Sequence, residues 1–112
     1  MKSNSLKETK HPAIILDTKH NILEYNPAFL EVVDSSTKRI KGRKCYKLLH
    51  GASHPPECCP MQNVLLYGDF HTEEMLMESL NEKYLVSCMP IHNEEGHIAQ
   101  VMHVLQRLQK QV

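Results

Sequence analysis

The stretch "AIILDTKHNILEYNPAFLEVV", residues 13–33, contains two short apolar runs that are followed by an asparagine–proline pair. The runs 12–17 and 22–25 are rich in residues that favour β-strands, and the turn-like "TKHN" separates them. Two apolar runs joined by so short a turn predict a β-hairpin.

The residues after this hairpin predict a short helix over 27–34. Asn26 offers a side-chain oxygen as an N-cap, and Pro27 suits the first helical position because its missing N–H is not needed there. The apolar side chains that follow repeat at helical spacing. They are Phe29, Leu30 and Val33.

Three further strands are expected in the C-terminal half, over 70–80, 84–91 and 97–108, with the short turns "NEK" and "HNEEG" between them. Consecutive strands with short turns form an antiparallel meander. If the first hairpin joins this meander, the result is an α+β fold with one five-stranded antiparallel sheet and the helices packed on one face.

The middle of the chain predicts two more helices. "GRKCYKLLHG" suits a short helix that ends at Gly51, and "PMQNVLLYG" suits a helix that begins at Pro60 and ends at Gly68. The segment between Gly51 and Pro60 is expected to be a loop, because its two prolines remove donors and restrict the residues before them.

Composition limits the classes of partner. The 112 residues suit one domain, and thirteen basic residues balance thirteen acidic ones. This balance gives no electrostatic footprint for nucleic acid, and no apolar run approaches the roughly 18 residues that insert across a membrane. Four cysteines without an export signal favour a reducing, cytoplasmic location with free thiols.

The order of these elements resembles a PAS domain, the sensory module of many bacterial and archaeal signalling proteins. Residues 13–33 are similar to the family's first hairpin and its asparagine-capped helix. "YLVSCMPIHNEEGHIAQVMHVLQ", 84–106, is similar to its last two strands, with Pro90 and Gly96 as landmarks. The resemblance covers about residues 11–106.

This resemblance implies a signal-sensing domain that passes its state to an effector through packing at a homodimer interface. The implied effectors are a histidine kinase of a two-component system, a cyclase or a transcription activator. Residues 1–10 are then a linker or a flanking helix, and 107–112 a tail or the start of an output helix. Where many members carry an Asp-Ile-Thr element, this chain has Arg107-Leu108-Gln109.

A local pattern, Cys-Tyr-x-x-x-His-Gly followed by a Pro-rich loop and Cys-Pro, resembles a subset of these domains. It maps onto Cys45, Tyr46, His50, Gly51, Pro55, Cys59 and Pro60. Members of this subset often have another cysteine three residues before the Cys-Pro cysteine. This chain has Pro56 there and places Cys58 next to Cys59 instead.

Thiolates and imidazoles bind zinc and other borderline or soft ions, so one interpretation of this cluster is a metal site. Its ligands would be Cys45, His50 and Cys59, with Cys58 or His54 as the fourth. The spacing weakens this interpretation, because residues five apart on a helix differ by roughly 140° around the axis. Zinc, an iron–sulfur cluster, haem or no cofactor at all therefore stay open.

Two other interpretations compete with metal binding. Cys59 is the expected N-cap of the helix at Pro60, where the helix dipole favours a thiolate, so it could act in a thiol redox switch with Cys45 or Cys58 as its partner. Alternatively, Cys45 is a small buried hydrophobic residue and His50 donates a hydrogen bond to a loop carbonyl near Gly51, so the cluster is only structural.

A ligand pocket between the sheet and the helices is the other candidate site. Its candidate residues are Phe29, Val33, Met75, Met77, Met89, Met102 and His103. His103 could approach a ligand from the sheet as an axial haem ligand does, although core packing also explains all seven. No catalytic motif is present, so we expect no enzyme. A ligand-free interaction module is the main alternative to a sensor.

Overall fold

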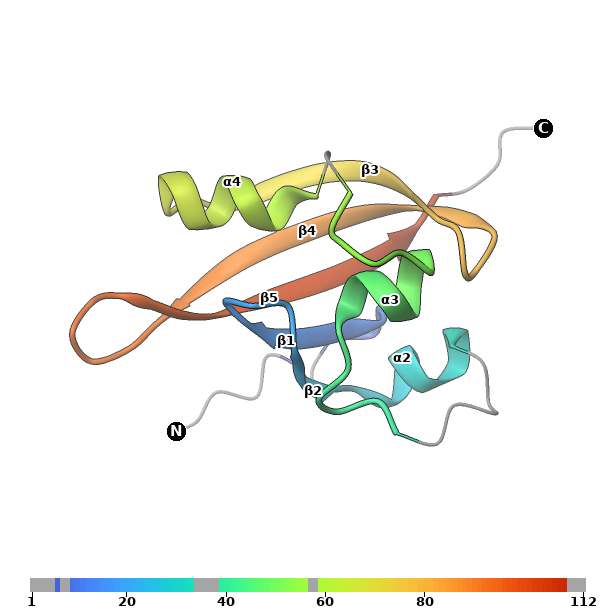
Figure 1. The fold of residues 1–112 in the computed structure, drawn as a ribbon, viewed down its shortest axis with the longest axis horizontal. Coiled ribbons are helices and arrows are strands. Elements are labelled where there is room, and N and C mark those ends of the chain that lie inside the picture. Colours follow the sequence, from blue (N-terminus) through green and yellow to red (C-terminus); the bar gives the residue numbers. More distant parts are fainter. Residues whose placement is uncertain (1–5, 7–8, 34–38, 57–58, 109–112) are drawn as a thin grey trace.

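The computed structural model describes residues 6, 9–33, 39–56 and 59–108. Five strands form one antiparallel sheet in the order β2-β1-β5-β4-β3, so the last strand lies between the first and the fourth. Three helices cover one face of this sheet (Figure 1). The elements in chain order are β1 (Ala13–Asp17), β2 (Ile22–Tyr25), α2 (Pro27–Val32), α3 (Cys45–His50), α4 (Pro60–Tyr67), β3 (His71–Met77), β4 (Glu82–His92) and β5 (Ile98–Arg107).

Asn26 joins the hairpin to α2, as expected from the sequence. Its Oδ1 accepts hydrogen bonds from the backbone N–H of Phe29, 3.0 Å away, and of Ala13, also 3.0 Å away. Its Nδ2 donates to the carbonyl of His11 at 2.8 Å. This buried side chain therefore caps the helix and fixes the chain that enters β1.

Strand β5 is the centre of the sheet. Its His103 lies opposite Ile14 of β1 and opposite Cys88 of β4, and its Met102 lies opposite Met89 of β4. Because successive side chains of a strand alternate between faces, His103 faces the helices and Met102 faces the other side. The expected α+β sheet with helices on one face is confirmed.

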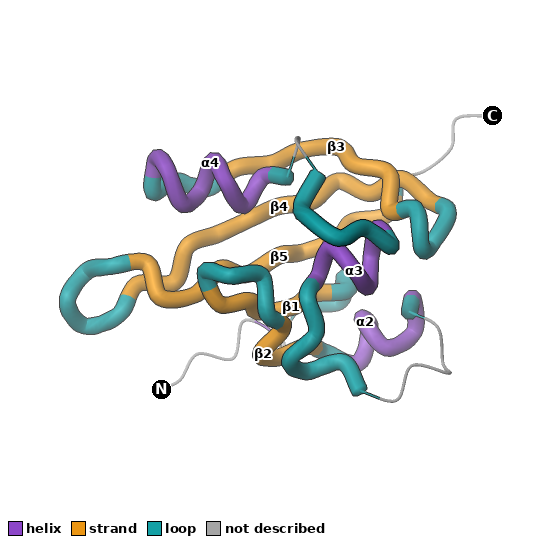
Figure 2. The backbone as a smooth tube through the Cα atoms, viewed as in Figure 1, coloured by secondary structure: helices purple, strands orange, loops and turns teal. Residues whose placement is uncertain are grey.

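The predicted strand over 70–80 is shorter in the structure, where β3 ends at Met77. The N–H of Leu80 donates to the carbonyl of Met77 at 2.9 Å, and Asn81 has a φ of 56°. These residues form the turn into β4, which Figure 2 shows as a loop at one end of the sheet. The apolar Leu80 follows Met75, Leu76 and Met77 after only two polar residues, so the sequence did not mark this turn.

A single hydrophobic core lies between the helices and the sheet. Every helix and strand that the structure describes contributes a buried side chain to it. Its fully buried large side chains are Ile14, Leu16, Ile22, Phe29, Leu49, Met61, Val64, Met77, Tyr84, Val86, Val101 and Leu105. Among the described residues, no helix is both long and apolar enough to cross a membrane.

Candidate functional site

A small cavity lies in this core, between the helical layer and the centre of the sheet. Its volume is about 20 Å³, which is enough space for about one water molecule. Residues of the β1–β2 turn, of α3 and the loop after it, of the start of α4 and of the three C-terminal strands line it. They are His20, Cys45, Tyr46, Leu49, His50, Pro55, Pro56, Cys59, Pro60, Met75, Met77, Val86 and His103.

His103 forms the floor of this cavity. Only 4% of the residue is exposed, and its Nε2 has no hydrogen-bond partner among the residues that the structure describes. Burial, with a smaller contribution from His20, lowers the pKa of this imidazole to about 3. His103 is therefore neutral at physiological pH, with a buried polar atom beside the cavity.

His20 is part of the site, although the sequence suggested only a solvated turn residue. Asp17 closes this turn, since its Oδ1 accepts hydrogen bonds from the N–H groups of Lys19 and Asn21 at 2.9 Å each. His20 itself has a φ of 73°, a conformation that few residues other than glycine adopt. This turn directs the imidazole toward α3.

The same turn holds the start of α3. The N–H of Cys45 donates to the carbonyl of His20 at 3.0 Å, and Sγ of Cys45 lies 3.8 Å from Nδ1 of His20. The rings of His20 and Tyr46 meet edge to face, with their centroids 5.5 Å apart. Because the pairing of this turn with residue 45 spans 25 positions, no local sequence pattern could have revealed His20.

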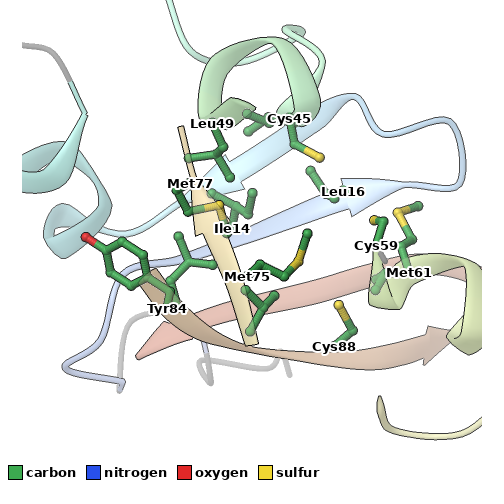
Figure 3. Close-up of a cluster of buried hydrophobic side chains, with 14 of the residues drawn as sticks. Ile14, Leu16, Cys45, Leu49, Cys59, Met61, Met75, Met77, Tyr84 and Cys88 are labelled. Carbon is green, nitrogen blue, oxygen red and sulfur yellow. The ribbon is translucent and has the colours of Figure 1, made fainter. Parts of the chain in front are cut away.

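Three thiols are buried in the core, and those of Cys45 and Cys59 line the cavity. They come from the start of α3, from the residue before α4 and from the middle of β4, and Figure 3 shows Cys45, Cys59 and Cys88 within one cluster of buried side chains. Burial raises the pKa of Cys45 to about 12, and it also raises the pKa of Cys88. Cys45 and Cys88 are consequently protonated thiols at physiological pH.

Cys59 is the N-cap of α4, as predicted, and its N–H donates to the carbonyl of Pro56 at 3.1 Å. Its side chain makes no capping hydrogen bond to the helix. The predicted thiolate at this position stays a prediction, and so does a role for Cys58, which lies outside the described residues.

The structure does not bring His50 and His54 to Cys45 as a ligand set. Nδ1 of His50 lies 2.6 Å from Oε1 of Glu78, on the turn between β3 and β4. His54 is exposed, and its ring nitrogen lies 3.3 Å from the carbonyl of Pro55. Cys45, His50 and Cys59 all line the cavity, but Nδ1 of His50 is engaged by Glu78, and no described group of three such residues could hold a metal ion.

The predicted pocket residues divide into three groups. Met75, Met77 and His103 line the cavity. Phe29 and Val33 are buried in the core but do not line it. Met89 and Met102 face each other across β4 and β5 on the opposite face of the sheet.

The described side chains do not fit the cofactors that the sequence left open. No three His, Cys, Asp or Glu residues within the described ranges are grouped closely enough to hold a metal ion. A haem needs a pocket of at least about 300 Å³, far more than this cavity offers. His103 has the right donor atom for an axial ligand but lacks the room above it.

A second hollow, of about 180 Å³, is more open and lies where the chain enters β1, near α2. Its lining includes Lys10, His11, Glu31 and Arg107. The Nε of Arg107 already pairs with Glu82 at 2.7 Å.

The chain was compared with known proteins. A family model described as the PAS fold matches residues 6–112. A search of curated proteins gave no match. The three solved structures described next are 13–17% identical and therefore bear on the fold alone.

The structures agree closely in architecture. A sensory box sensor histidine kinase from Vibrio cholerae is 17% identical with a TM-score of 0.70, and the alignment covers 93% of this chain and 86% of that chain. A PAS domain from Colwellia psychrerythraea is 13% identical with a TM-score of 0.76, with 96% and 93% covered. The LOV protein of Rhodobacter sphaeroides is 15% identical with a TM-score of 0.70; the alignment covers 94% of this chain and only 63% of that one.

The family model covers nearly the whole chain, and the strand order, the asparagine-capped helix and the helices on one face agree with it. This chain belongs to the PAS fold family.

Proposed function

We propose that the chain is a sensory domain, without enzymatic activity, in which occupancy of the cavity beside His103 changes the packing of the central strand. The observation that carries this proposal is the buried His103, which lines the cavity and whose Nε2 has no hydrogen-bond partner within the described ranges. An unpaired buried polar group costs stability, so its presence in a native fold requires an explanation. A ligand that pairs with it is such an explanation.

Strand β5 offers a direct route for the signal. His103 faces the cavity, while its neighbour Met102 faces the other side of the sheet against Met89. A ligand that moves the imidazole would therefore move a side chain on the opposite face. We propose that this face or the adjoining termini meet a second copy of the domain, and that the dimer passes the change to an effector.

A histidine kinase, a cyclase and a transcription activator are the effector classes we propose, in a larger cytoplasmic protein. The Vibrio cholerae structure, which shares the fold, is titled a sensor histidine kinase. Such a switch requires that the ligand bind two states with different affinity. Light scattering with and without ligand would test whether the domain dimerises.

The test of the sensory role is a search for ligand-dependent stability. Protein purified anaerobically without a tag would be analysed for metals, for visible absorption and for bound small molecules. It would then be screened against a metabolite and metal library by thermal unfolding. We expect an occupant that stabilises the wild type but not His103→Phe, which removes Nε2; His92→Phe at the exposed end of β4 is the matched control. No occupant from any source would contradict the proposal.

A thiol redox switch is the second candidate, because Cys45 and Cys59 both line the same small cavity. Hydrogen peroxide would oxidise the two thiols to one disulfide and be reduced to two molecules of water. Peptide mapping after peroxide treatment would detect a Cys45–Cys59 crosslink with a loss of two hydrogens. Absence of that crosslink, with the thiols unchanged, would remove this candidate.

A ligand-free interaction module is the remaining alternative. Exposed apolar side chains occur at the end of α4 and just after it, where Leu66 is 74%, Tyr67 71% and Phe70 58% exposed. Exposed apolar clusters often mark protein contacts. This alternative would gain support if no small molecule or metal bound and Tyr67→Ser weakened self-association.

A further inference from the structure

We propose that the outer edge of β3 binds an extended, basic segment of a partner protein, which would add a strand to the five-stranded sheet. This site uses the backbone and the outer face of β3 rather than the core cavity, so the inference goes beyond the proposed sensory function. Four features of β3 lead to it: its open edge, its regular backbone, its exposed apolar ends and its acidic centre.

The two edges of the sheet differ in how they are covered. At the β2 edge, the N–H of Ile22 donates to the carbonyl of Arg43 at 2.9 Å, and the N–H of Gly42 donates to the carbonyl of Ile22 at 2.7 Å. Strand β3 is the last strand at the opposite edge (Figure 1). Among the described residues, only the turn after Met77 makes backbone hydrogen bonds to β3 from outside the sheet. The β3 edge therefore presents N–H and C=O groups with which a further strand could pair.

The backbone of β3 lacks the features that usually protect an edge strand. Its pairing with β4 runs without a register shift, whereas the β1–β2 and β4–β5 pairings each contain one. Its seven residues, HTEEMLM, include no lysine and no proline. Bulges, lysines and prolines are common means of preventing edge pairing. In a regular antiparallel edge strand, every second residue directs both its N–H and its C=O outward, as strand addition requires.

Apolar side chains lie near both ends of the outer face of β3. Because Met75 and Met77 are buried in the core, Glu74 and Leu76 lie on opposite faces of the strand from them only where the alternation allows, and both are exposed there. Leu76 is 46% exposed, and Phe70, one residue before the strand, is 58% exposed. An added strand with apolar side chains six residues apart would cover both ends.

The centre of β3 is acidic, which determines the charge of the partner. Oε1 of Glu73 lies 3.3 Å from Nε2 of His71, whereas Glu74 forms no ion pair with another described residue. The strand contains neither lysine nor arginine. Opposite charges on neighbouring strands stabilise pairing, so a basic side chain opposite Glu74 would favour binding.

The same charges disfavour a second copy of β3 as the occupant. Full overlap of two antiparallel copies of His71–Met77 places Glu74 opposite its own copy. Like charges directly opposite each other are destabilising. A basic segment of another protein avoids this repulsion, so charge complementarity favours it over self-pairing.

The experiment uses the blocked peptide Val-Thr-Lys-Lys-Thr-Thr-Val as a probe and Val-Thr-Glu-Glu-Thr-Thr-Val as its control. In the antiparallel register, the lysines lie opposite Glu74 and Glu73, and the valines lie opposite Leu76 and Phe70. The full chain, labelled with ¹⁵N, would be titrated with each peptide at pH 7 and low ionic strength. We expect saturable amide shifts in β3 with the basic peptide, slower exchange at every second β3 amide, and about tenfold weaker binding of the acidic peptide.

N-methylation of the basic peptide tests whether the backbone pairs with β3. Methyl groups on the edge that faces β3 remove the donors, whereas methyl groups on the other edge face solvent. One peptide would be methylated at its second, fourth and sixth residues and the other at its third and fifth residues. Only one of the two should bind, and equal affinities would contradict strand addition.

A charge reversal locates the site on β3. Glu74→Lys should weaken binding of the basic peptide about three- to tenfold and strengthen binding of the acidic peptide by a similar factor. Glu94→Lys, at an exposed residue of the turn between β4 and β5, makes the same change in net charge and should leave both affinities unchanged.

Three results would overturn the inference: no saturable shift in β3 with the basic peptide, equal affinity for the two charge types, or an unchanged preference in Glu74→Lys. Protection of β3 amides that rises with protein concentration in the absence of peptide would also overturn it, because a second copy would then occupy the edge. The sensory proposal is tested separately, since these measurements do not involve the cavity beside His103.

Discussion

A neutral imidazole in the middle of the central strand makes folding sensitive to acid. The pKa of His103 is lowered from 6.5 to about 3 in the folded chain, so the unfolded chain binds this proton more readily. Stability is fully present above pH 6.5 and falls as the pH decreases toward 3. The expected slope for one proton is about 1.4 kcal/mol per pH unit over this window.

Denaturant unfolding at pH 7, 6, 5 and 4 would measure this slope. The variant His103→Phe lacks the titrating group, so its free energy of unfolding should depend less steeply on pH. The other titrating groups are the same in both proteins, so their contributions cancel when the variant is compared with the wild type. Parallel curves for the wild type and the variant would show that the pKa of the imidazole is the same in the folded and unfolded chains.

The thiol of Cys45 should react slowly with alkylating reagents. Its pKa is raised from 9.0 to about 12, which lowers the thiolate fraction at pH 8 by about 1,000-fold. Mass spectrometry of iodoacetamide labelling, in buffer and in denaturant, would give the ratio of rates. Labelling at the unfolded rate would mean an accessible thiol with an ordinary pKa, and only faster labelling would indicate an activated thiol and favour the redox switch.

Single residues of the site could be predicted only in part. Cys45, Cys59 and His103 were identified from residue type and position, and all three line the cavity. His20 was not, because its role depends on a turn with positive φ and on a contact with α3. His50 was assigned to the cysteines because Glu78, its actual partner, lies 28 residues away in the chain.

At the scale of elements, the end of α3 depends on the residue that follows the helix, Gly51. Gly51 follows α3 with a φ of 64°, a conformation that costs a residue with a Cβ about 1 kcal/mol. A Cβ at this position would lie 3.6 Å from Oγ of Ser79, an ordinary contact, so conformation alone sets the cost. We expect Gly51→Ala to lower the free energy of unfolding by about 1 kcal/mol.

Gly51→Asn is the control for this prediction, because asparagine tolerates the left-handed conformation better than alanine does. Urea titrations of the three proteins would rank them in the order glycine, asparagine, alanine. Equal stability of all three would show that the end of α3 adopts another conformation in solution.

The pair between His50 and Glu78 should hold the end of α3 against the β3–β4 turn. The hydrogen bond from His50 lowers the pKa of Glu78, which keeps this carboxylate charged. Because Glu78 is exposed, the pair is expected to be weak, and Glu78→Gln should speed amide exchange at Gly51 and Ser79 by about two- to fivefold. Hydrogen exchange at Ile14 should not change, and a change there would indicate a global effect.

Most elements could be predicted because their signals are local. The asparagine–proline pair before α2 and the glycines after α3 and α4 mark helix ends, and the structure places the ends within two residues of them. The end of β3 was missed because the apolar Leu80 lies just beyond the strand, while the turn depends on the positive φ of Asn81. Local sequence therefore predicts that a strand is present better than it predicts the residue at which the strand ends.

For the whole molecule, one shared core predicts one cooperative transition. Leu105 of β5 is fully buried between the sheet and the helices. Leu105→Ala should cost about 2–5 kcal/mol and should shift the unfolding curves measured by far-ultraviolet circular dichroism and by tyrosine fluorescence together. Leu66→Ala, at an exposed position, should change stability little, and separate transitions would contradict a single core.

The whole fold was predictable because element order, alternation and a family resemblance agreed. The cavity was not, since its walls come from segments as far apart as the β1–β2 turn and β5. Met89 and Met102 show the same limit: their residue type suits a pocket, but the face of the sheet that they occupy depends on strand register. Site geometry therefore follows from tertiary packing.

The strand order also has a consequence for synthesis on the ribosome. Strand β1 needs β5 as a partner, yet β5 ends at Arg107 and is made last. Until then the growing chain carries an apolar hairpin with one open edge, and such edges invite pairing with other chains. The domain can complete its sheet only after release of its last strand, so chaperones that shield nascent chains should affect its yield more than its final stability.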